Sequence, residues 1–283
     1  MGNLRWRRGK DRFFHMLFIL ATSLAMLVLM VLLTQIIMDG LPRLSGDFIT
    51  SFPSNDPVDA GIKSAIIGTL YVIGIMIPIA FMLGVGAAIY LEEFAQKNRA
   101  TNFIQLNIRT LAGVPSIVYG ILGLTLFVRG MSLGQSILSG ALTMTLLVLP
   151  IIIVAAQEAI RAVPRSRREA AFALGATKWQ MVSRAVIPSA FPGILTGMIL
   201  AVSRAVGETA PLLMVGAFTF VAFLPESPLD SFTVLPIQFY NWISRPQEEY
   251  HMLAASGIIV LLVILIMLNI SAVWLRNKYQ KRI

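Results

Sequence analysis

The sequence contains no cysteine and only two histidines among its 283 residues. Disulfide bonds, thiol nucleophiles and cysteine-ligated metals are therefore excluded, but the absence of cysteine does not identify the cellular compartment. His15 and His251 each lie beside an apolar run and far apart in the sequence. Because the ligands of a metal site cluster, we interpret both as interfacial residues. We predict that this chain binds no cofactor and no metal.

Charged residues are scarce as well. They make up 13% of the chain, against 57% hydrophobic residues, whereas globular domains average about 25% charged and about 45–50% apolar residues. The apolar residues form runs long enough to cross a bilayer, which needs about 20 residues per helix. A net charge of +9 would suit a nucleic-acid partner, but the basic residues flank the apolar runs. That pattern is typical of membrane orientation, so we predict a membrane protein with no nucleic-acid partner.

We predict an all-α membrane protein with six transmembrane helices. The six apolar segments are residues 13–38, 64–91, 111–127, 136–157, 192–223 and 252–275. The first of them exceeds the roughly 7–15 residues of a signal-peptide core, and no convincing small-residue cleavage site follows it. We interpret it as a first transmembrane helix that stays in place. Pro78 and Pro150 lie inside predicted spans, where a proline removes a helix hydrogen bond and favours a kink.

The basic residues divide unequally between the two sides of these spans. Eighteen lie in the N-terminal tail, the 92–110 and 158–190 loops and the C-terminal tail, whereas the remaining loops carry four and are rich in acids. The excess of lysine and arginine on cytoplasmic loops predicts that both termini and the 158–190 loop are cytoplasmic. The one remaining basic residue, Arg204, lies inside a predicted span.

The cytoplasmic segment 164–188 reads PRSRREAAFALGATKWQMVSRAVIP. Ser166 and Glu169 have capping-box spacing, the alanines that follow favour helix, and Gly175 suits a left-handed helix end. A second helix is predicted from about residue 177 to 186, before Pro188. The first helix is too short to be stable alone in water, so it needs a docking partner. A hairpin that packs only on its own spans is the alternative, and the pattern alone favours neither.

Arg204 and Glu208 are four residues apart, so they share one face of a helix and can pair. If the span begins near Gly193, Arg204 lies about 16 Å deep at about 1.5 Å per residue, in a hydrocarbon core about 30 Å thick. Ionisable residues at that depth face a protein interior or a water-filled path. The pair is either a structural salt bridge or a transient anion site, because a guanidinium fork matches an oxyanion. A bent or re-entrant piece is expected over about 211–224.

The residues Glu169-Ala170-Ala171, Gly175 and Ile187-Pro188 resemble the EAA loop of ABC importer permeases, with a departure at Ala185. The resemblance implies a type I ABC importer permease fold, in which the short helix enters a groove on a cytosolic ATPase. The chain has no phosphate-binding P-loop, since the fragment at 61–64 lacks the glycine spacing. It is therefore predicted not to be an enzyme, and ATP and magnesium are expected on partner ATPase subunits.

Three further segments resemble one particular type of ABC importer permease. SRAVGETAPLL (203–213), GVPSIVYGILGL (113–124) and LPIQFYNWISRPQEEY (235–250) are similar to the A-type permease subunit of the bacterial high-affinity phosphate system. This implies a multi-pass protein of the inner (plasma) membrane that translocates inorganic phosphate by alternating access, with Arg204 and Glu208 on the substrate path. The implied partners are a C-type sister phosphate permease, an ATP-binding subunit dimer, an external phosphate-binding protein and membrane lipid.

Other cargoes and mechanisms compete with this interpretation. A permease for molybdate or sulfate has the same architecture, but the Arg204–Glu208 pair and the neighbouring motifs argue against it. A passive anion channel is an alternative from another class. The EAA-like loop argues against the channel, which has no need of an ATPase dock. A membrane-embedded enzyme is disfavoured because the spans carry no metal-ligand cluster and no nucleophile–base constellation.

The chain is accordingly divided into four parts. Residues 1–12 form a basic cytoplasmic tail, and 13–63 form the first transmembrane helix with an external loop. Residues 64–275 form the permease core, which includes the coupling loop 158–190, and 276–283 form a second basic cytoplasmic tail.

Overall fold

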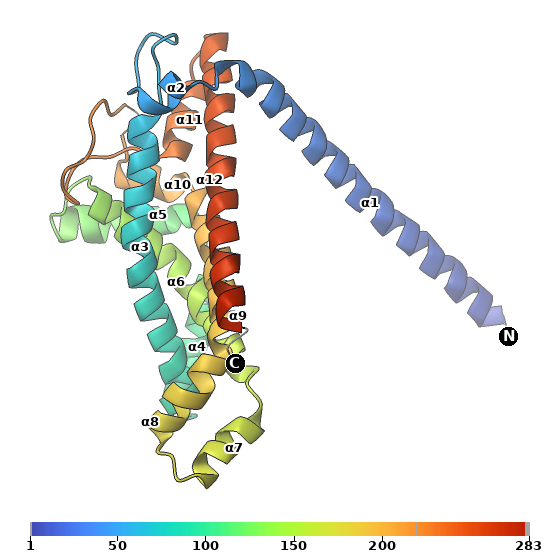
Figure 1. The fold of residues 1–283 in the computed structure, drawn as a ribbon. Coiled ribbons are helices and arrows are strands. Elements are labelled where there is room, and N and C mark those ends of the chain that lie inside the picture. Colours follow the sequence, from blue (N-terminus) through green and yellow to red (C-terminus); the bar gives the residue numbers. More distant parts are fainter. Residues whose placement is uncertain (1, 219, 281–283) are drawn as a thin grey trace.

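The computed structural model describes residues 2–218 and 220–280, and every regular element in that part of the chain is a helix. Figure 1 shows long helices packed side by side, with the first helix leaving the bundle. Met1, Thr219 and residues 281–283, which fall in the predicted tails and fifth span, lie outside the described residues. The predicted all-α membrane fold is confirmed.

Five helical runs in the described part of the chain are long and apolar enough to cross a membrane, or six if one bent pair counts as a span. The long helices are α1 (Gly2–Gly40), α3 (Lys63–Ile89), α6 (Ile137–Arg161), α9 (Ile187–Val206) and α12 (Glu248–Gln280). The shorter helices are α2 (Gly46–Thr50), α4 (Arg99–Leu111), α5 (Ser116–Gly123), α7 (Arg165–Ala173), α8 (Lys178–Met181), α10 (Ala210–Val215) and α11 (Leu235–Ile243). A 3₁₀ turn (Leu41–Arg43) and three π-helical turns (Tyr90–Phe94, Leu124–Gly130 and Val182–Val186) join them.

The third predicted span, 111–127, is bent. It contains the end of α4 and the whole of α5, and these helices meet at an angle of 106°. Pro115 is the residue before α5, and a proline disfavours helical geometry at the residue that precedes it. The chain therefore turns at 112–115 before helix resumes.

The fifth predicted span, 192–223, has different limits from those expected. Helix α8 continues through the π-helical turn into α9, so the predicted helix end before Pro188 is wrong. Pro188 lies in the first turn of α9, and the preceding π-helical turn accommodates its missing N–H. At the other end α9 stops at Val206, and the short α10 follows. Gly216 ends α10 in the left-handed conformation with a φ of +95°, so the chain is bent within the segment predicted at about 211–224.

Helix α6 packs between α3 and α9, and small residues set the distance between α6 and α9. A Cβ atom added to Gly193 would lie 2.8 Å from Ala159 Cβ, and one added to Gly197 would lie 2.3 Å from Ala155 Cβ. Gly193 and Gly197, four residues apart on α9, thus lie opposite Ala159 and Ala155, four residues apart on α6. The two helices are therefore antiparallel. Close contact of this kind is typical of membrane helices, where small residues let backbones approach.

Helix α1 lies apart from the other spans (Figure 1). It leaves the bundle at Gly40, whose carbonyl accepts a hydrogen bond of 2.7 Å from Ser256 Oγ on α12. None of its most apolar stretch is buried within the chain. Its apolar side chains are therefore available to lipid or to another subunit.

The contact between α3 and the segment before α11 yields a stability prediction. A Cβ atom on Gly68 would lie 2.0 Å from the carbonyl oxygen of Thr233, whereas one on Gly74 of the same helix meets no atom within 4 Å. We expect Gly68→Ala to lower the free energy of unfolding by about 1–3 kcal/mol, the usual cost of overpacking. Gly74→Ala is the matched control and should not destabilise the protein. Thermal unfolding in detergent measures both, and equal midpoints for the two variants would contradict this contact.

Candidate functional site

The charged pair predicted within the fifth span is present. Arg204 Nε lies 3.4 Å from Glu208 Oε1, and the two side chains are 51% and 19% exposed. The predicted shared helix face is wrong, because α9 ends at Val206 and Glu208 lies beyond the Gly207 cap. The Glu208 N–H still donates to the Ala205 carbonyl at 3.1 Å, so the chain stays wound tightly enough for the pair to meet.

The packing of α9 on α6 locates this pair along the membrane axis. Gly197 lies against Ala155. Because the helices are antiparallel, counting seven residues forward along α9 and seven residues back along α6 places Arg204 level with Val148. Val148 lies near the middle of α6, which runs from Ile137 to Arg161. Ionisable side chains at the middle of a membrane-crossing helix usually face a protein interior or a water-filled path.

The second predicted site, on the cytoplasmic loop, is a helical hairpin. Glu169, Ala170 and Ala171 lie together on α7, and Gly175 follows the helix with a φ of +78°. The predicted left-handed turn at Gly175 is confirmed. Its N–H donates to the Phe172 carbonyl at 2.9 Å, so this glycine closes the last turn of α7.

Two details of the predicted hairpin are corrected. The capping box at Ser166 and Glu169 is wrong, because α7 begins after Pro164 without a side-chain cap. Proline already holds the backbone angle that a helix start needs. A capping box is found instead at α8, between Thr177 and Gln180, where the chain re-enters helix after the glycine turn.

Ile187 and Pro188 lie on a different element from the other predicted coupling residues. They form the junction between the π-helical turn Val182–Val186 and α9. Ile187 packs against the main hydrophobic core of the bundle. The structure thus brings Glu169, Ala170, Ala171 and Gly175 together on the hairpin and assigns the Ile-Pro pair to the start of a span.

The hairpin also carries apolar side chains that the sequence reasoning missed. Phe172, Leu174 and Trp179 are 49%, 89% and 63% exposed. The sequence did contain a signal for these exposed side chains, because apolar residues occur there in an otherwise basic loop. Together with the alanines of α7 they leave an exposed apolar surface on the hairpin, and exposed apolar patches often mark protein–protein contacts.

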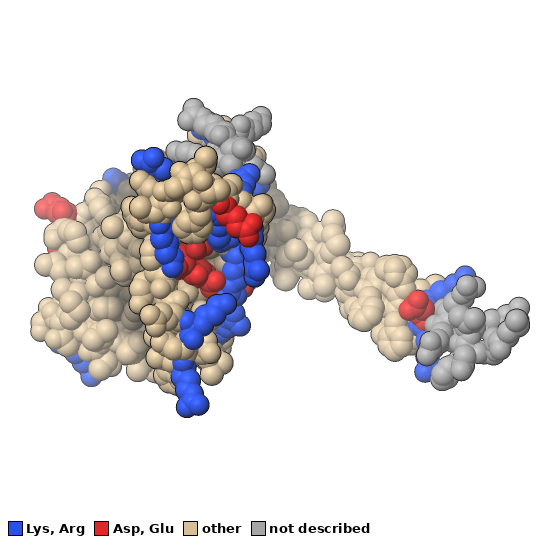
Figure 2. Space-filling view, turned by 90° about the horizontal axis from the view of Figure 1, so that it is seen from below, with Lys and Arg blue, Asp and Glu red and all other residues tan. Residues whose placement is uncertain are grey.

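Ion pairs fasten the hairpin to the spans. Arg168 Nη2 lies 2.8 Å from Glu93 Oε1, and Arg168 also donates to the Ile160 and Val163 carbonyls at 2.9 and 2.6 Å. Arg161 Nε donates to Glu92 Oε2 at 2.9 Å. Figure 2 shows acidic side chains surrounded by lysines and arginines on this face of the molecule. The π-helical end of α3 is therefore tied to both α6 and α7.

These acids were missed because the pairs join positions distant in sequence. Glu92 and Glu93 directly follow an apolar run on the basic side of the protein, which was the available signal. Among residues 2–218 and 220–280, no group of three or more histidine, aspartate or glutamate side chains lies close enough to hold a metal ion.

A helical bundle with five or six helical runs in its described residues able to cross a membrane, a charged pair near the end of one of them and an exposed helical hairpin at its basic end is the architecture of a multi-pass membrane protein. The chain belongs to the family of binding-protein-dependent transport system inner membrane components, which matches residues 80–283. It is thus a multi-pass permease subunit of an ABC importer in the bacterial inner membrane.

Relatives and a solved structure agree with this assignment. The chain is 33% identical to the probable ABC transporter permease protein YqgI of Bacillus subtilis, over 98% of each chain. It is 34% identical over 222 residues to the phosphate transport system permease protein PstA 1 of Mycobacterium tuberculosis, covering 76% of this chain and 70% of that one. The resemblance to phosphate permeases predicted from the sequence motifs is confirmed.

The fold resembles that of a chain in the crystal structure of a bacterial alginate ABC transporter. The TM-score is 0.65 at 15% identity, and the match covers 94% of this chain and 95% of that one. At this identity the likeness concerns the fold alone, and it agrees with the predicted type I importer architecture.

The Glu93–Arg168 pair generates a prediction about the hairpin. We expect Arg168→Gln to weaken the attachment of α7 by about 1–3 kcal/mol, since it removes hydrogen bonds from a charged donor. Hydrogen exchange measured by mass spectrometry should become faster in α7. Arg165→Gln, a change of the same charge on the same helix at an exposed position, is the control and should leave exchange unchanged. Equal exchange in the two variants would show that the pair does not hold the hairpin.

Proposed function

We propose that this permease translocates inorganic phosphate into the cell by alternating access, driven by a separate ATPase. The observation that carries the proposal is the Arg204–Glu208 pair, with a half-exposed guanidinium level with the middle of α6. The similarity to a phosphate transport system permease supports the choice of cargo. We assign Arg204 and Glu208 to the substrate path.

The chemistry of the pair suits phosphate. A guanidinium presents a planar fork of donors that matches two oxygens of an oxyanion. Glu208 holds Arg204 at 3.4 Å in this structure, and it can instead accept a hydrogen bond from a protonated phosphate. Sulfate at neutral pH has no proton to donate, so a carboxylate at this position disfavours it. Permeases for molybdate or sulfate remain the competing assignment, and a passive anion channel is a more distant one.

The hairpin supports coupling to an ATPase. Leu174 and Trp179 expose apolar surface at the basic end of the molecule, and Glu169 is exposed on the α7 surface. We propose that α7, with Glu169, Ala170, Ala171 and Gly175, docks on an ATP-binding subunit of a dimer. Ile187 and Pro188 then carry the movement of the hairpin into α9. ATP and magnesium belong to that partner.

Further partners follow from the uncovered surfaces and the charge distribution. The apolar side chains of α1 are left open by the chain itself, which suits a C-type sister permease and membrane lipid. In Figure 1 both termini lie toward the end of the bundle that carries α7 and α8. We propose that this basic end is cytoplasmic and that the opposite loops receive an external phosphate-binding protein.

Uptake of radiolabelled phosphate tests the cargo. The complex of both permeases and the ATPase, reconstituted in vesicles with the binding protein, should accumulate phosphate only with ATP. Excess sulfate or molybdate should not compete. An ATPase-active complex that accumulates sulfate or molybdate instead of phosphate would overturn the cargo and leave the importer architecture intact.

Variants of the pair belong to the same uptake assay. Arg204→Lys keeps the charge but loses the fork, and a loss of roughly 1.4 kcal/mol of cargo binding corresponds to about tenfold slower uptake at low phosphate. Glu208→Gln should let sulfate compete, because the carboxylate that repels it is gone. Asp11→Asn, at an exposed acid of the N-terminal tail, is the matched control. Wild-type kinetics in both pair variants would leave the pair a structural role.

The docking role of the hairpin has its own test. Gly175 has a φ of +78°, a conformation that asparagine tolerates and β-branched residues do not. We expect Gly175→Val to abolish ATP-dependent uptake and Gly175→Asn to retain much of it, while both proteins reach the membrane. Glu169→Lys should reduce co-purification of the ATPase. Full uptake by Gly175→Val would remove the turn from the coupling mechanism.

A further inference from the structure

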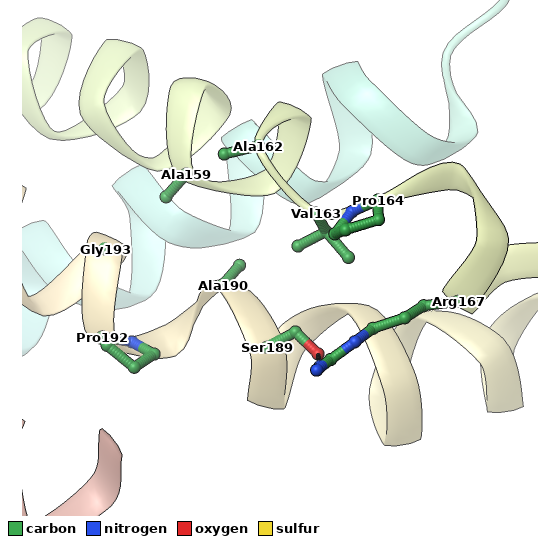
Figure 3. Close-up of a pocket in the computed structure, with 9 residues that line it drawn as sticks. All are labelled: Ala159, Ala162, Val163, Pro164, Arg167, Ser189, Ala190, Pro192 and Gly193. Carbon is green, nitrogen blue, oxygen red and sulfur yellow. Dashed lines mark hydrogen bonds between the residues drawn. The ribbon is translucent and has the colours of Figure 1, made fainter. Parts of the chain in front are cut away.

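A cavity lies between the end of α6, the connection to α7 and the first turns of α9 (Figure 3). Its volume is about 400 Å³. Small side chains make up much of its wall, among them Ala159, Ala162, Ala190 and Gly193. Since a water molecule occupies about 30 Å³ in the liquid, the space suffices for a tetrahedral oxyanion with part of its hydration shell.

Arg167 supplies a cationic edge to this cavity. In Figure 3 its side chain extends from α7 toward Ser189 on α9, and Arg167 Nη1 donates a hydrogen bond to Ser189 Oγ. Ser189 Oγ donates in turn to the Ala185 carbonyl at 2.6 Å. One guanidinium and one hydroxyl group therefore meet at the cavity wall.

Two nearby arginines, Arg161 and Arg168, are neutralised by acids, whereas Arg167 is not. Arg161 pairs with Glu92 and Glu158, and Arg168 pairs with Glu93. Within residues 2–218 and 220–280, no carboxylate lies within ion-pair distance of Arg167. Its donors other than Nη1 are thus available to an anion that enters the cavity.

The cavity also shares a face of α9 with Arg204. Ser189 and Gly193 border the cavity, and Leu200 and Arg204 follow on the same helix. At 3.6 residues per turn, these four positions lie within about 60° of one another around the helix axis. Gly193, Leu200 and Arg204 are exposed within the chain. Ser189 and Arg204 are separated along the axis by about 22 Å at a rise of about 1.5 Å per residue.

We propose that this cavity is a second oxyanion site, at which inorganic phosphate is held by Arg167 and Ser189 before it leaves toward the cytoplasm. The choice of inorganic phosphate as occupant rests on the proposed transport function. The guanidinium fork exchanges its bond to Ser189 for bonds to phosphate oxygens, and the serine hydroxyl turns from Ala185 toward the anion. A single unneutralised arginine in an open cavity binds weakly, as a site from which cargo must depart requires.

A phospholipid headgroup offers the same phosphate chemistry, so the experiment must separate the two sources. Because the chain has no cysteine, Ala162→Cys places a single reporter thiol of this subunit in the cavity wall. The complete complex is incorporated in nanodiscs of phosphatidylcholine, with or without an anionic phospholipid, and the rate at which a charged maleimide modifies this thiol is measured. Inorganic phosphate should slow the modification severalfold. Ala100→Cys, at the exposed start of α4, should be unaffected.

Second substitutions then identify the anion ligand. Added to the reporter, Arg167→Gln should abolish protection by phosphate, Arg167→Lys should retain part of it, and Arg165→Gln should retain all of it. Each variant is compared after the ATPase co-purifies at the wild-type level, which excludes a failure of assembly. Equal protection in Arg167→Gln and wild type would overturn the site. Protection that requires an anionic phospholipid and ignores inorganic phosphate would overturn free phosphate as the occupant.

The same preparation separates failure of the site from failure of the proposed transport function. Uptake of phosphate without protection of the reporter thiol would remove the cytoplasmic site and leave phosphate transport intact. Protection without uptake would retain an oxyanion site at Arg167 and overturn phosphate as the transported cargo.

Discussion

The absence of water from the hydrocarbon core of a membrane governs this structure. Every backbone N–H and C=O at that depth must find a partner inside the protein, so the chain crosses as long helices. Where helix is interrupted, other elements cover the gap. Pro211 and Leu212 of α10 are buried, and a Cβ atom on Gly120 of α5 would lie 2.8 Å from the Pro211 Cα. The irregular backbone after α9 is thus shielded by the bent third span.

The same constraint sorts the charged side chains. At the basic end of the molecule, Arg161 and Arg168 are neutralised by acids at the end of α3, and their ion pairs hold the hairpin against the spans. Arg204 pairs with Glu208 while remaining 51% exposed. Arg167 meets a serine instead of a carboxylate. Arg161 and Arg168 therefore stabilise the contact between the hairpin and the spans. Arg204 and Arg167 retain N–H donors that could bind an oxyanion.

Two apolar surfaces show that this subunit is built for assembly. Helix α1 leaves its most apolar stretch uncovered within the membrane-spanning part of the molecule, and the hairpin leaves Leu174 89% exposed beyond it. The two surfaces suit two different partners, because the surface of α1 meets an apolar environment and the surface of the hairpin meets an aqueous one. Because α7 is tied through Arg168 to α3 and to the end of α6, a displacement of the hairpin acts on the spans directly.

The sequence by itself determined the membrane class, the approximate spans, the glycine turn at Gly175 and the spacing of Arg204 and Glu208. These features depend on composition, on apolar run length and on contacts between residues a few positions apart. Only the tertiary structure decided the 106° bend of the third span, the continuation of helix through Pro188 and the pairing of Glu93 with Arg168. It also assembled the cavity beside Arg167 from three segments. A local pattern can mark a proline as a break in a helix, but the angle between helices and the pairs between distant residues depend on how the helices pack against one another, as where Gly197 meets Ala155.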